Sequence, residues 1–228
     1  MKSFILKNKY KIAIAFSILL IALISIILYF NIPRLSYSYS DTYKWYIVDN
    51  AFGNSKSYKV SDEINGKPVV GIGKRAFFRH SNLEKIEFEN EKNIKVIEKL
   101  AFAECPKLSE IDLRYVQEIE RNAFMYDESL KNINLSAKNI GASAFYKCTS
   151  LENIELNIGV KTIGSMAFSE TKIKEIVIPS GVADVAVDAF IYCDNLEKIV
   201  VKSKLLLENE YLKSLNNVVF EVEWWNHC

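Results

Sequence analysis

The sequence predicts an α/β-type repeat solenoid that is capped at both ends and preceded by one N-terminal transmembrane helix. Two observations lead to this prediction. From Ala76 to Ala189 the dipeptide Ala-Phe stands at six positions with spacings of 25, 22, 21, 23 and 22 residues, which lie within the range of solenoid repeats. A run of 19 residues, 12–30, carries no charged side chain. Half of the 228 residues are hydrophobic, so a large core can form.

The apolar run is long enough to cross a bilayer. Nineteen helical residues extend about 28 Å at about 1.5 Å per residue, close to the roughly 30 Å of a hydrocarbon core. A cleaved signal peptide is the alternative, but its apolar region is shorter and ends in a small-x-small site. The Ala-x-Ala at Ala13 stands at the start of the run instead. We therefore expect an uncleaved signal-anchor helix over residues 12–32.

Charges on either side of the run predict its orientation. Four lysines lie within residues 1–11, and only Arg34 closely follows the run. By the positive-inside rule, residues 1–11 form a cytoplasmic stub and the repeats are extracytoplasmic on a single-pass plasma-membrane protein. Pro33 ends the helix, and the polar segment 33–42 is expected to be a tether.

The net charge argues against nucleic acid as a partner. Five of the 29 basic residues precede Asp41 and none of the 28 acids does, which leaves 24 basic against 28 acidic residues, a net charge of −4. A nucleic-acid-binding domain should instead present a basic face.

Apolar columns accompany the Ala-Phe pairs and define six repeats over residues 71–202. Five residues before each Phe stand Ile72, Ile97, Ile119, Ile140, Ile163 and Val185. After each Phe, at the three positions of an L-x-x-I-x-I stretch, stand Leu83, Ile86 and Phe88, and in the next repeats Leu108, Ile111 and Leu113; Leu130, Ile133 and Leu135; Leu151, Ile154 and Leu156; Ile173, Ile176 and Ile178; Leu196, Ile199 and Val201.

The pattern has a physical reading. The L-x-x-I-x-I stretch alternates with period two, which predicts a short strand with one buried face. One strand per repeat stacks on the next to form a parallel sheet. Phe fills the width of each coil, and the small Ala beside it lets coils approach closely. Because no single repeat can bury its apolar face alone, the stack itself forms the core.

These repeats resemble the leucine-rich repeats of BspA-like bacterial surface proteins. The resemblance is carried by motifs such as Ile163-Gly164-Ser165-Met166-Ala167-Phe168 and Ile176-Val177-Ile178-Pro179, and it covers about residues 58–201. It implies a stack of leucine-rich repeats and a role in adhesion or in contact with a host or matrix. High usage of Lys, Asn and Ile indicates an AT-rich, bacterial coding genome.

Both ends of such a stack need caps. We expect an N-terminal cap over residues 43–70, with two strands of a hairpin around Gly53-Asn54. A C-terminal cap over 203–228 is expected to contain a helix-like segment at 205–215 and a closing strand at 218–222. Trp224 and Trp225 are expected to cover the last coil, with a functional aromatic tail as the alternative.

One column contains residues that could bind a metal. The third residue after the Phe gives the column His80, Cys105, Asp127, Cys148 and, beyond the fifth repeat, which is one residue short, Cys193. Stacked residues lie in a line, whereas zinc needs four converging ligands, so buried structural thiols are the expectation. For Cys228, the functional alternatives are a reactive thiol and a link between two chains. Gly71-Ile72-Gly73-Lys74 lacks the full phosphate-loop spacing, and we predict no cofactor and no small-molecule substrate.

The outward face of the strands is the candidate binding site. In the first four repeats the residues that alternate with the buried positions are acids and amides, and the candidate partner-binding residues are Glu87, Glu110, Asp112, Arg114, Asn132, Asn134, Asn153 and Glu155. Solenoids use such faces for binding, although an ordinary solvated face remains the alternative. A second patch follows the Phe positions and contains Phe78, Met125, Tyr126, Tyr146, Ile191 and Tyr192.

The sequence thus predicts a non-enzymatic binding module that presents its repeats to a protein or glycan outside the membrane. An envelope accessory protein that docks onto another membrane protein of the same cell is the alternative. No catalytic constellation accompanies either of the two histidines.

Overall fold

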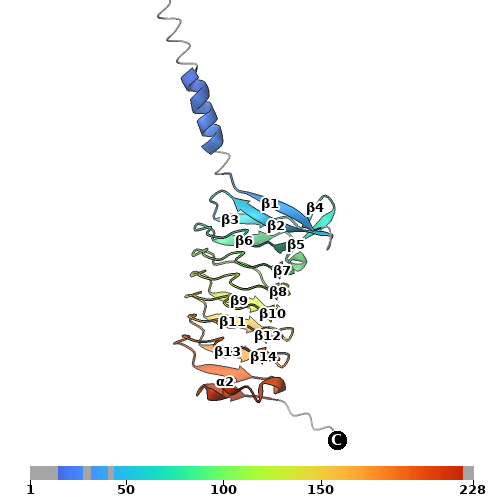
Figure 1. Cartoon of the computed structure of the whole chain (residues 1–228), viewed down its shortest axis with the longest axis vertical. Coiled ribbons are helices and arrows are strands. Elements are labelled where there is room, and N and C mark those ends of the chain that lie inside the picture. Colours follow the sequence, from blue (N-terminus) through green and yellow to red (C-terminus); the bar gives the residue numbers. More distant parts are fainter. Residues whose placement is uncertain (1–14, 28–31, 41–43, 223–228) are drawn as a thin grey trace, which may run out of the picture.

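The computed structural model describes residues 15–27, 32–40 and 44–222. Residues 44–222 form one stack of flat coils, each lying on the one before it (Figure 1). With its capping segments the solenoid has about eight turns. The predicted repeat stack with a parallel sheet is confirmed. The return segments are turns and short strands, not the helices that an α/β class implies.

The continuous ladder of the solenoid lies at the Ile column that precedes Ala-Phe. Each coil gives it one short strand, and neighbouring strands pair in parallel with the column residues in register, for example Ile72 with Ile97 and Ile97 with Ile119. Its members in the repeats are β5 (Lys67–Ile72), β7 (Val96–Ile97), β8 (Glu118–Ile119), β10 (Asn139–Ile140), β12 (Thr162–Ile163) and β14 (Asp184–Val185). We call it the Ile ladder.

The L-x-x-I-x-I stretches form the second face, the strand face. Its strands are β6 (Lys85–Phe88), β9 (Asn132–Leu135), β11 (Asn153–Leu156), β13 (Glu175–Ile178) and β15 (Lys198–Val201). They pair in parallel, as predicted, but in separate short sheets, β3–β6, β9–β11 and β13–β15–β16. In the second repeat the corresponding stretch makes one isolated bridge, between Lys85 and Glu110.

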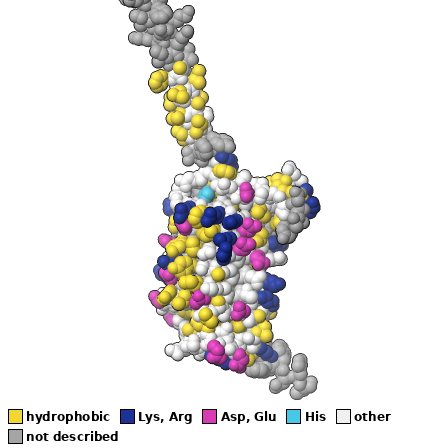
Figure 2. Space-filling model, in the orientation of Figure 1, with side chains coloured by type: hydrophobic (Ala, Val, Ile, Leu, Met, Phe, Trp, Pro, Cys, Tyr) yellow, Lys and Arg dark blue, Asp and Glu magenta, His cyan; other side chains and the backbone are white. Residues whose placement is uncertain are grey.

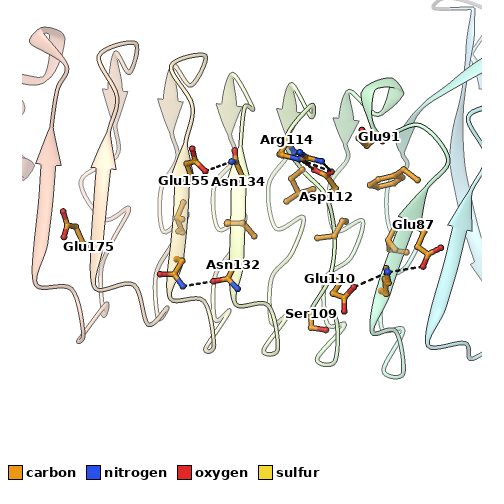
Figure 3. Close-up of a pocket in the computed structure, with 18 residues that line it drawn as sticks. Glu87, Glu91, Ser109, Glu110, Asp112, Arg114, Asn132, Asn134, Glu155 and Glu175 are labelled. Carbon is orange, nitrogen blue, oxygen red and sulfur yellow. Dashed lines mark hydrogen bonds and ion pairs between the residues drawn. The ribbon is translucent and has the colours of Figure 1, made fainter.

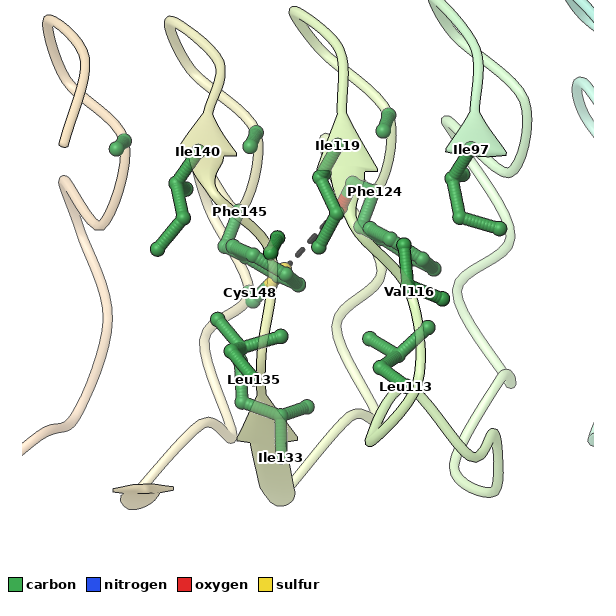
Figure 4. Packing of buried hydrophobic residues seen from close by; sticks show 14 of the residues in the cluster. Ile97, Leu113, Val116, Ile119, Phe124, Ile133, Leu135, Ile140, Phe145 and Cys148 are labelled. Atoms are coloured by element: carbon green, nitrogen blue, oxygen red, sulfur yellow. Dashed lines mark hydrogen bonds between the residues drawn. The ribbon is translucent and has the colours of Figure 1, made fainter. Parts of the chain in front are cut away.

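Stacked phenylalanines fill the space between the two faces. Phe77, Phe102, Phe124, Phe145 and Phe168 are fully buried, and successive rings along the column to Phe190 lie 5.0 to 5.8 Å apart with interplanar angles of 13° or less. Figure 4 shows Phe124 and Phe145 between Ile119 and Ile140 on one side and Leu113 and Leu135 on the other. The core is therefore one continuous column that every coil extends.

The N-terminal cap differs from the expected hairpin. The strands β2 (Trp45–Phe52) and β3 (Ser57–Val60) both form, but β2 joins the Ile ladder beside β5 and β3 pairs with β6 on the strand face. The segment expected to be a tether contains β1 (Arg34–Ser40), which pairs antiparallel with β2. A short strand, β4 (Glu63–Ile64), pairs with β5. The chain thus covers the edge of the first coil with strands from both sides of Gly53.

The C-terminal cap begins with the 3-10 helix η2 (Lys204–Leu206) and the short helix α2 (Glu210–Ser214). The closing strand β16 (Val218–Phe220) pairs in parallel with β15, where a strand was expected. A further 3-10 helix, η1 (Glu91–Asn93), follows β6. Trp224, Trp225 and Cys228 lie outside the described residues, so their expected roles are not addressed.

The predicted membrane anchor is wrong. The described part of the N-terminal segment is helical over residues 15–27. Among the described residues, no helix has the length and apolar character needed to cross a membrane. This finding overturns the transmembrane helix over 12–32 and the single-pass plasma-membrane localisation. The expected stub, 1–11, lies outside the described residues.

Candidate functional site: a polar groove on the strand face

A shallow groove of about 910 Å³ runs across the strand face of the first four repeats and reaches the fifth at Glu175 (Figure 3). All eight candidate residues from the sequence line it: Glu87, Glu110, Asp112, Arg114, Asn132, Asn134, Asn153 and Glu155. They lie together because each strand contributes its outward positions and the strands stack in register. The groove also contains residues that the sequence did not single out, among them Phe88, Glu91 and Glu175.

Lys85 joins the first two coils at one end of the groove. Its ammonium lies 3.2 Å from a carboxylate oxygen of Glu87 and 3.3 Å from one of Glu110. Both contacts are exposed, and hydrogen bonding to the two carboxylates raises the pKa of Lys85. Lys85 remains charged, and its charge is shared between two acids.

Asp112 and Arg114 form a local ion pair in the second coil. The Asp112 carboxylate accepts hydrogen bonds from the Arg114 side chain and, at 3.0 Å, from its backbone N–H. The Arg114 guanidinium holds the pKa of Asp112 below its usual range. Because the carboxylate bonds to the backbone two residues on, it competes with ladder hydrogen bonds. This is the coil whose strand-face stretch makes only an isolated bridge.

Amide side chains form a hydrogen-bonded ladder across the third and fourth coils. Asn153 donates to the side-chain oxygen of Asn132 at 2.7 Å, and Asn134 donates to the Glu155 carboxylate. Asn157 donates to Asn134 at 2.9 Å and to Ser136 at 2.8 Å. The ladder fixes these side chains on the groove, where Glu155 is exposed.

The floor of the groove is partly apolar. Ile86 and Ile133 are buried beneath it, but Ile111 and Ile154 are only half-buried, as is Phe88 at the N-terminal end. The corresponding Ile176 in the fifth coil is fully covered. The apolar floor is therefore open to a ligand only in the coils that line the groove.

The groove is strongly acidic. Its lining includes the acids Glu87, Glu91, Glu110, Asp112, Glu155 and Glu175, against the two cations Lys85 and Arg114. Both cations are already engaged with acids of the groove. The surplus of four negative charges favours a cationic partner.

The residues that the sequence did not single out have recognisable signals. Glu91 lies in η1, and this helix occupies the extra length of the first repeat spacing, 25 residues against 21 to 23 for the others. Phe88 occupies a core column of the repeat pattern and pairs with Val60 of β3, yet it is half-buried, so the pattern alone did not mark it as part of the groove.

The second patch is a ridge of aromatic residues on the return segments. Tyr126 and Tyr146 pack edge to face at 5.7 Å, and the Lys147 ammonium lies 5.3 Å from both ring centres. Tyr146 also donates to Glu170 at 2.9 Å. These contacts pack neighbouring coils against one another at Tyr126 and Tyr146.

The thiol column lies along the core, with Cys105 and Cys148 buried and Cys193 half-buried. Cys105, Cys148 and Cys193 are free thiols, and each donates to the backbone oxygen of the Phe in a preceding coil, at 3.0 to 3.1 Å. Within residues 15–27, 32–40 and 44–222, no group of three or more His, Cys, Asp or Glu side chains is placed to hold a metal ion.

The fold and the groove define a leucine-rich-repeat module with an open, acidic binding face. The family model described as "BspA type Leucine rich repeat region" matches residues 45–139 and 117–221, in six copies. The chain therefore belongs to the BspA-type leucine-rich-repeat family, which confirms the resemblance seen in the sequence. Proteins built of such repeats are generally non-catalytic binding modules.

Solved structures share the fold. A leucine-rich cell surface protein from Faecalibacterium prausnitzii A2-165 matches with a TM-score of 0.63 and 22% identity, over 75% of this chain and 53% of its own. The pneumococcal vaccine antigen PcpA matches with a TM-score of 0.58 and 25% identity, over 82% and 46%. The leucine-rich-repeat protein of T. pallidum matches with a TM-score of 0.50 and 23% identity, over 73% and 68%. The chain thus spans about half the length of the first two, and no curated protein matches it.

Proposed function

We propose that this protein is a non-catalytic binding module whose groove on the strand face takes an extended, basic segment of a partner protein. The observation that carries the proposal is the groove itself, about 910 Å³ across consecutive coils, with six acids and two engaged cations in its lining. A repeat surface of this kind binds through an extended face and not through a closed pocket.

The floor and walls of the groove suit an extended chain. In a strand, alternate side chains point to opposite faces. Apolar side chains of the partner would contact the half-buried Ile111 and Ile154, and its lysines or arginines would reach the carboxylates of Glu110 and Glu155 at the walls. The amide ladder of Asn132 and Asn153 offers side-chain donors and acceptors to the polar backbone between them.

The biological setting that we propose is adhesion, that is, contact with a host or matrix protein. PcpA, at 25% identity, is described as a vaccine antigen, and this description supports a contact role of that kind. A glycan partner would use the same amides and carboxylates but would not need the surplus of negative charge.

A designed peptide tests the site directly. The probe is a fluorescent dodecapeptide of alternating lysine and valine, and binding to the full chain is followed by anisotropy at low and at moderate salt. The double charge reversal Glu110→Lys with Glu155→Lys is expected to weaken binding at least about tenfold, equivalent to about 1.4 kcal/mol, and to reduce the salt dependence.

The matched control reverses two exposed acids that lie off the groove, Glu128→Lys with Asp184→Lys, and so changes the net charge equally. We expect it to leave binding within about threefold of the parent. An equal loss in both double variants would show that the peptide responds only to overall charge and would overturn the site. Tight binding of an alternating glutamate–valine peptide would overturn the proposed partner chemistry.

A further inference from the structure

A column of cations lies at the other side of the core from the groove. The residue three positions before the stacked Phe is basic in the first three repeats and uncharged in the last three: Lys74, Lys99 and Arg121, then Ala142, Ser165 and Val187. We call Lys74, Lys99 and Arg121 the basic column. Figure 2 shows Lys and Arg side chains gathered over the first coils of the solenoid.

The backbone sets the spacing of the basic column. Each member stands two residues beyond a paired residue of the Ile ladder, and the neighbouring coils are bonded at this level. The N–H of Arg75 donates to the oxygen of Lys99 at 3.2 Å, and the N–H of Leu100 donates to that of Arg121 at 3.4 Å. Strands paired in this way lie about 4.8 Å apart, so the three cations follow the solenoid axis at one charge per coil.

The neighbouring acids do not pair with the column. Glu98 accepts from the backbone N–H of Lys74 at 2.9 Å, and Glu120 accepts from that of Lys99 at 2.9 Å. Ten ion pairs are formed among the described residues, and none of them involves Lys74, Lys99 or Arg121. The carboxylates that could neutralise the column are therefore bonded to the backbone of the turns.

The cations repel one another. The positive charge of Arg121 is the largest cause that lowers the pKa of Lys99, followed by burial and by the charges of Lys74 and Arg75. The attraction of Glu120 is the smallest of the causes. At Lys99 the repulsion from the basic neighbours thus exceeds the attraction of Glu120, and an anion that bridges the three coils would relieve this repulsion.

We propose that the basic column binds a linear acidic polysaccharide, with one carboxylate or sulfate of the glycan facing each coil. The spacing of the coils, about 4.8 Å, corresponds to roughly one sugar unit of an extended chain that carries one acidic group per unit. Arg75 flanks the column, and its guanidinium lies 5.3 Å from the ring of Phe78. This side chain adds a fourth cation beside the line of three.

The repeats from the fourth onward limit the length of the site. Their residues at this position are Ala142, Ser165 and Val187, so the column ends after three charges. A short acidic oligosaccharide is therefore sufficient to occupy it. The site uses none of the residues that line the groove, so the binding of acidic glycan and the binding of a basic peptide are separate properties that can fail independently.

The test uses the full chain and an oligogalacturonate, in which every sugar carries a carboxylate. Binding is measured by titration calorimetry at low and at moderate salt, with a neutral dextran oligosaccharide as reference. We expect the oligogalacturonate to bind and the dextran not to bind. The triple variant Lys74→Gln, Lys99→Gln, Arg121→Gln is expected to lose at least about tenfold in affinity, while the affinity for the lysine–valine peptide is retained.

A matched triple variant removes the same charge elsewhere: Lys131→Gln, Lys161→Gln, Lys172→Gln. All three lysines are exposed and lie outside the column. Affinity within about threefold of the parent is expected for this control, and the melting temperatures of both triple variants should match that of the parent. Equal losses in the two triple variants would overturn the proposal. So would equal affinity for an oligothymidylate or a polyglutamate peptide of the same charge, because the site would then recognise any polyanion.

Discussion

Asp127 lies in the core, and its side-chain oxygen Oδ1 accepts a hydrogen bond from the backbone N–H of Cys105 at 2.9 Å. At the same position of other coils, Cys105 and Cys148 donate their thiols to backbone oxygens of Phe77 and Phe124. The second oxygen of Asp127 has no hydrogen-bond partner among the described residues. Burial raises the pKa of Asp127 well above its usual value. A neutral carboxyl group, which can donate as the thiols do, is the form that fits this column.

The first prediction concerns the pH dependence of stability. In an unfolded chain the pKa of Asp is about 4, so the folded chain, with its raised pKa, holds the proton more tightly. The stabilisation from this group is complete below about pH 4 and is lost as the pH rises toward the folded value. Asp127→Asn keeps a neutral side chain at every pH. We expect its free energy of unfolding to exceed that of the parent by about 1–3 kcal/mol at pH 8, with little difference at pH 4.

Urea denaturation of both proteins between pH 4 and pH 8 measures this difference. Asp184→Asn serves as the control because Asp184 is exposed, and it should follow the parent at each pH. A constant difference between Asp127→Asn and the parent across the range would contradict the proposed titration.

The second prediction concerns thiol reactivity. Burial raises the pKa of Cys105, Cys148 and Cys193, and the thiolate is the reactive form. Cys148 is fully buried, whereas Cys193 is half-buried. With iodoacetamide at pH 8, the native protein should be labelled at Cys193 well before Cys105 or Cys148, and all three should react in urea. Peptide mass spectrometry reads the order, and labelling of Cys148 as fast as Cys193 in the native state would contradict the burial of this column.

The third prediction concerns a close approach of two coils at Gly141. A Cβ on Gly141 would lie 2.5 Å from the backbone nitrogen of Arg121 and 2.5 Å from the carbonyl carbon of Glu120. Backbone atoms cannot move aside as a flexible side chain can, so Gly141→Ala should cost about 1–3 kcal/mol of stability. A Cβ on Gly159 would meet its nearest atom, the backbone oxygen of Ser136, at 3.4 Å. Gly159→Ala should therefore cost less, and equal midpoints of urea unfolding for the two variants would refute the close approach.

The fourth prediction concerns the phenylalanine column. Phe145 is fully buried, with ring centres 5.1 Å from Phe124 and 5.6 Å from Phe168. Phe145→Ala removes a ring from the middle of the stack and should cost about 3–5 kcal/mol. Tyr192→Ala, at a side chain that is 63% exposed, should stay within about 0.5 kcal/mol of the parent. Thermal unfolding followed by circular dichroism compares them, and similar losses in both would argue against a continuous core.

Much of the fold could be predicted from the sequence because every repeat contributes the same positions to one shared core. The Phe column, the Ile column and the outward positions of the strands were all assigned from spacing, and the eight candidate residues line a single groove. Residues that recur at one position of a stacked repeat must face the same surroundings. Their role as a binding site remains a prediction for the peptide experiment.

The N-terminal region shows why some structural features could not be predicted from the sequence. Residues 33–42 are polar and short and were expected to be a tether, yet Arg34–Ser40 forms β1 because a partner strand, β2, lies beside it. An alternating Ser and Tyr segment carries no local signal of which strand it will pair with. The apolar run likewise shows composition alone, and no helix among the described residues has the length and apolar character to cross a membrane.

The sequence by itself determined the number of repeats, the residues of the core and the outward-facing columns, because these depend on periodicity along the chain. The tertiary structure decided which hydrogen bonds join the coils. It made the Ile ladder continuous and divided the strand face into short sheets. It also bonded Glu98 and Glu120 to the turns of preceding coils and, within the described part of the chain, left Lys74, Lys99 and Arg121 without ion pairs. These features depend on contacts between residues more than 20 positions apart, and a single repeat carries no local signal for them.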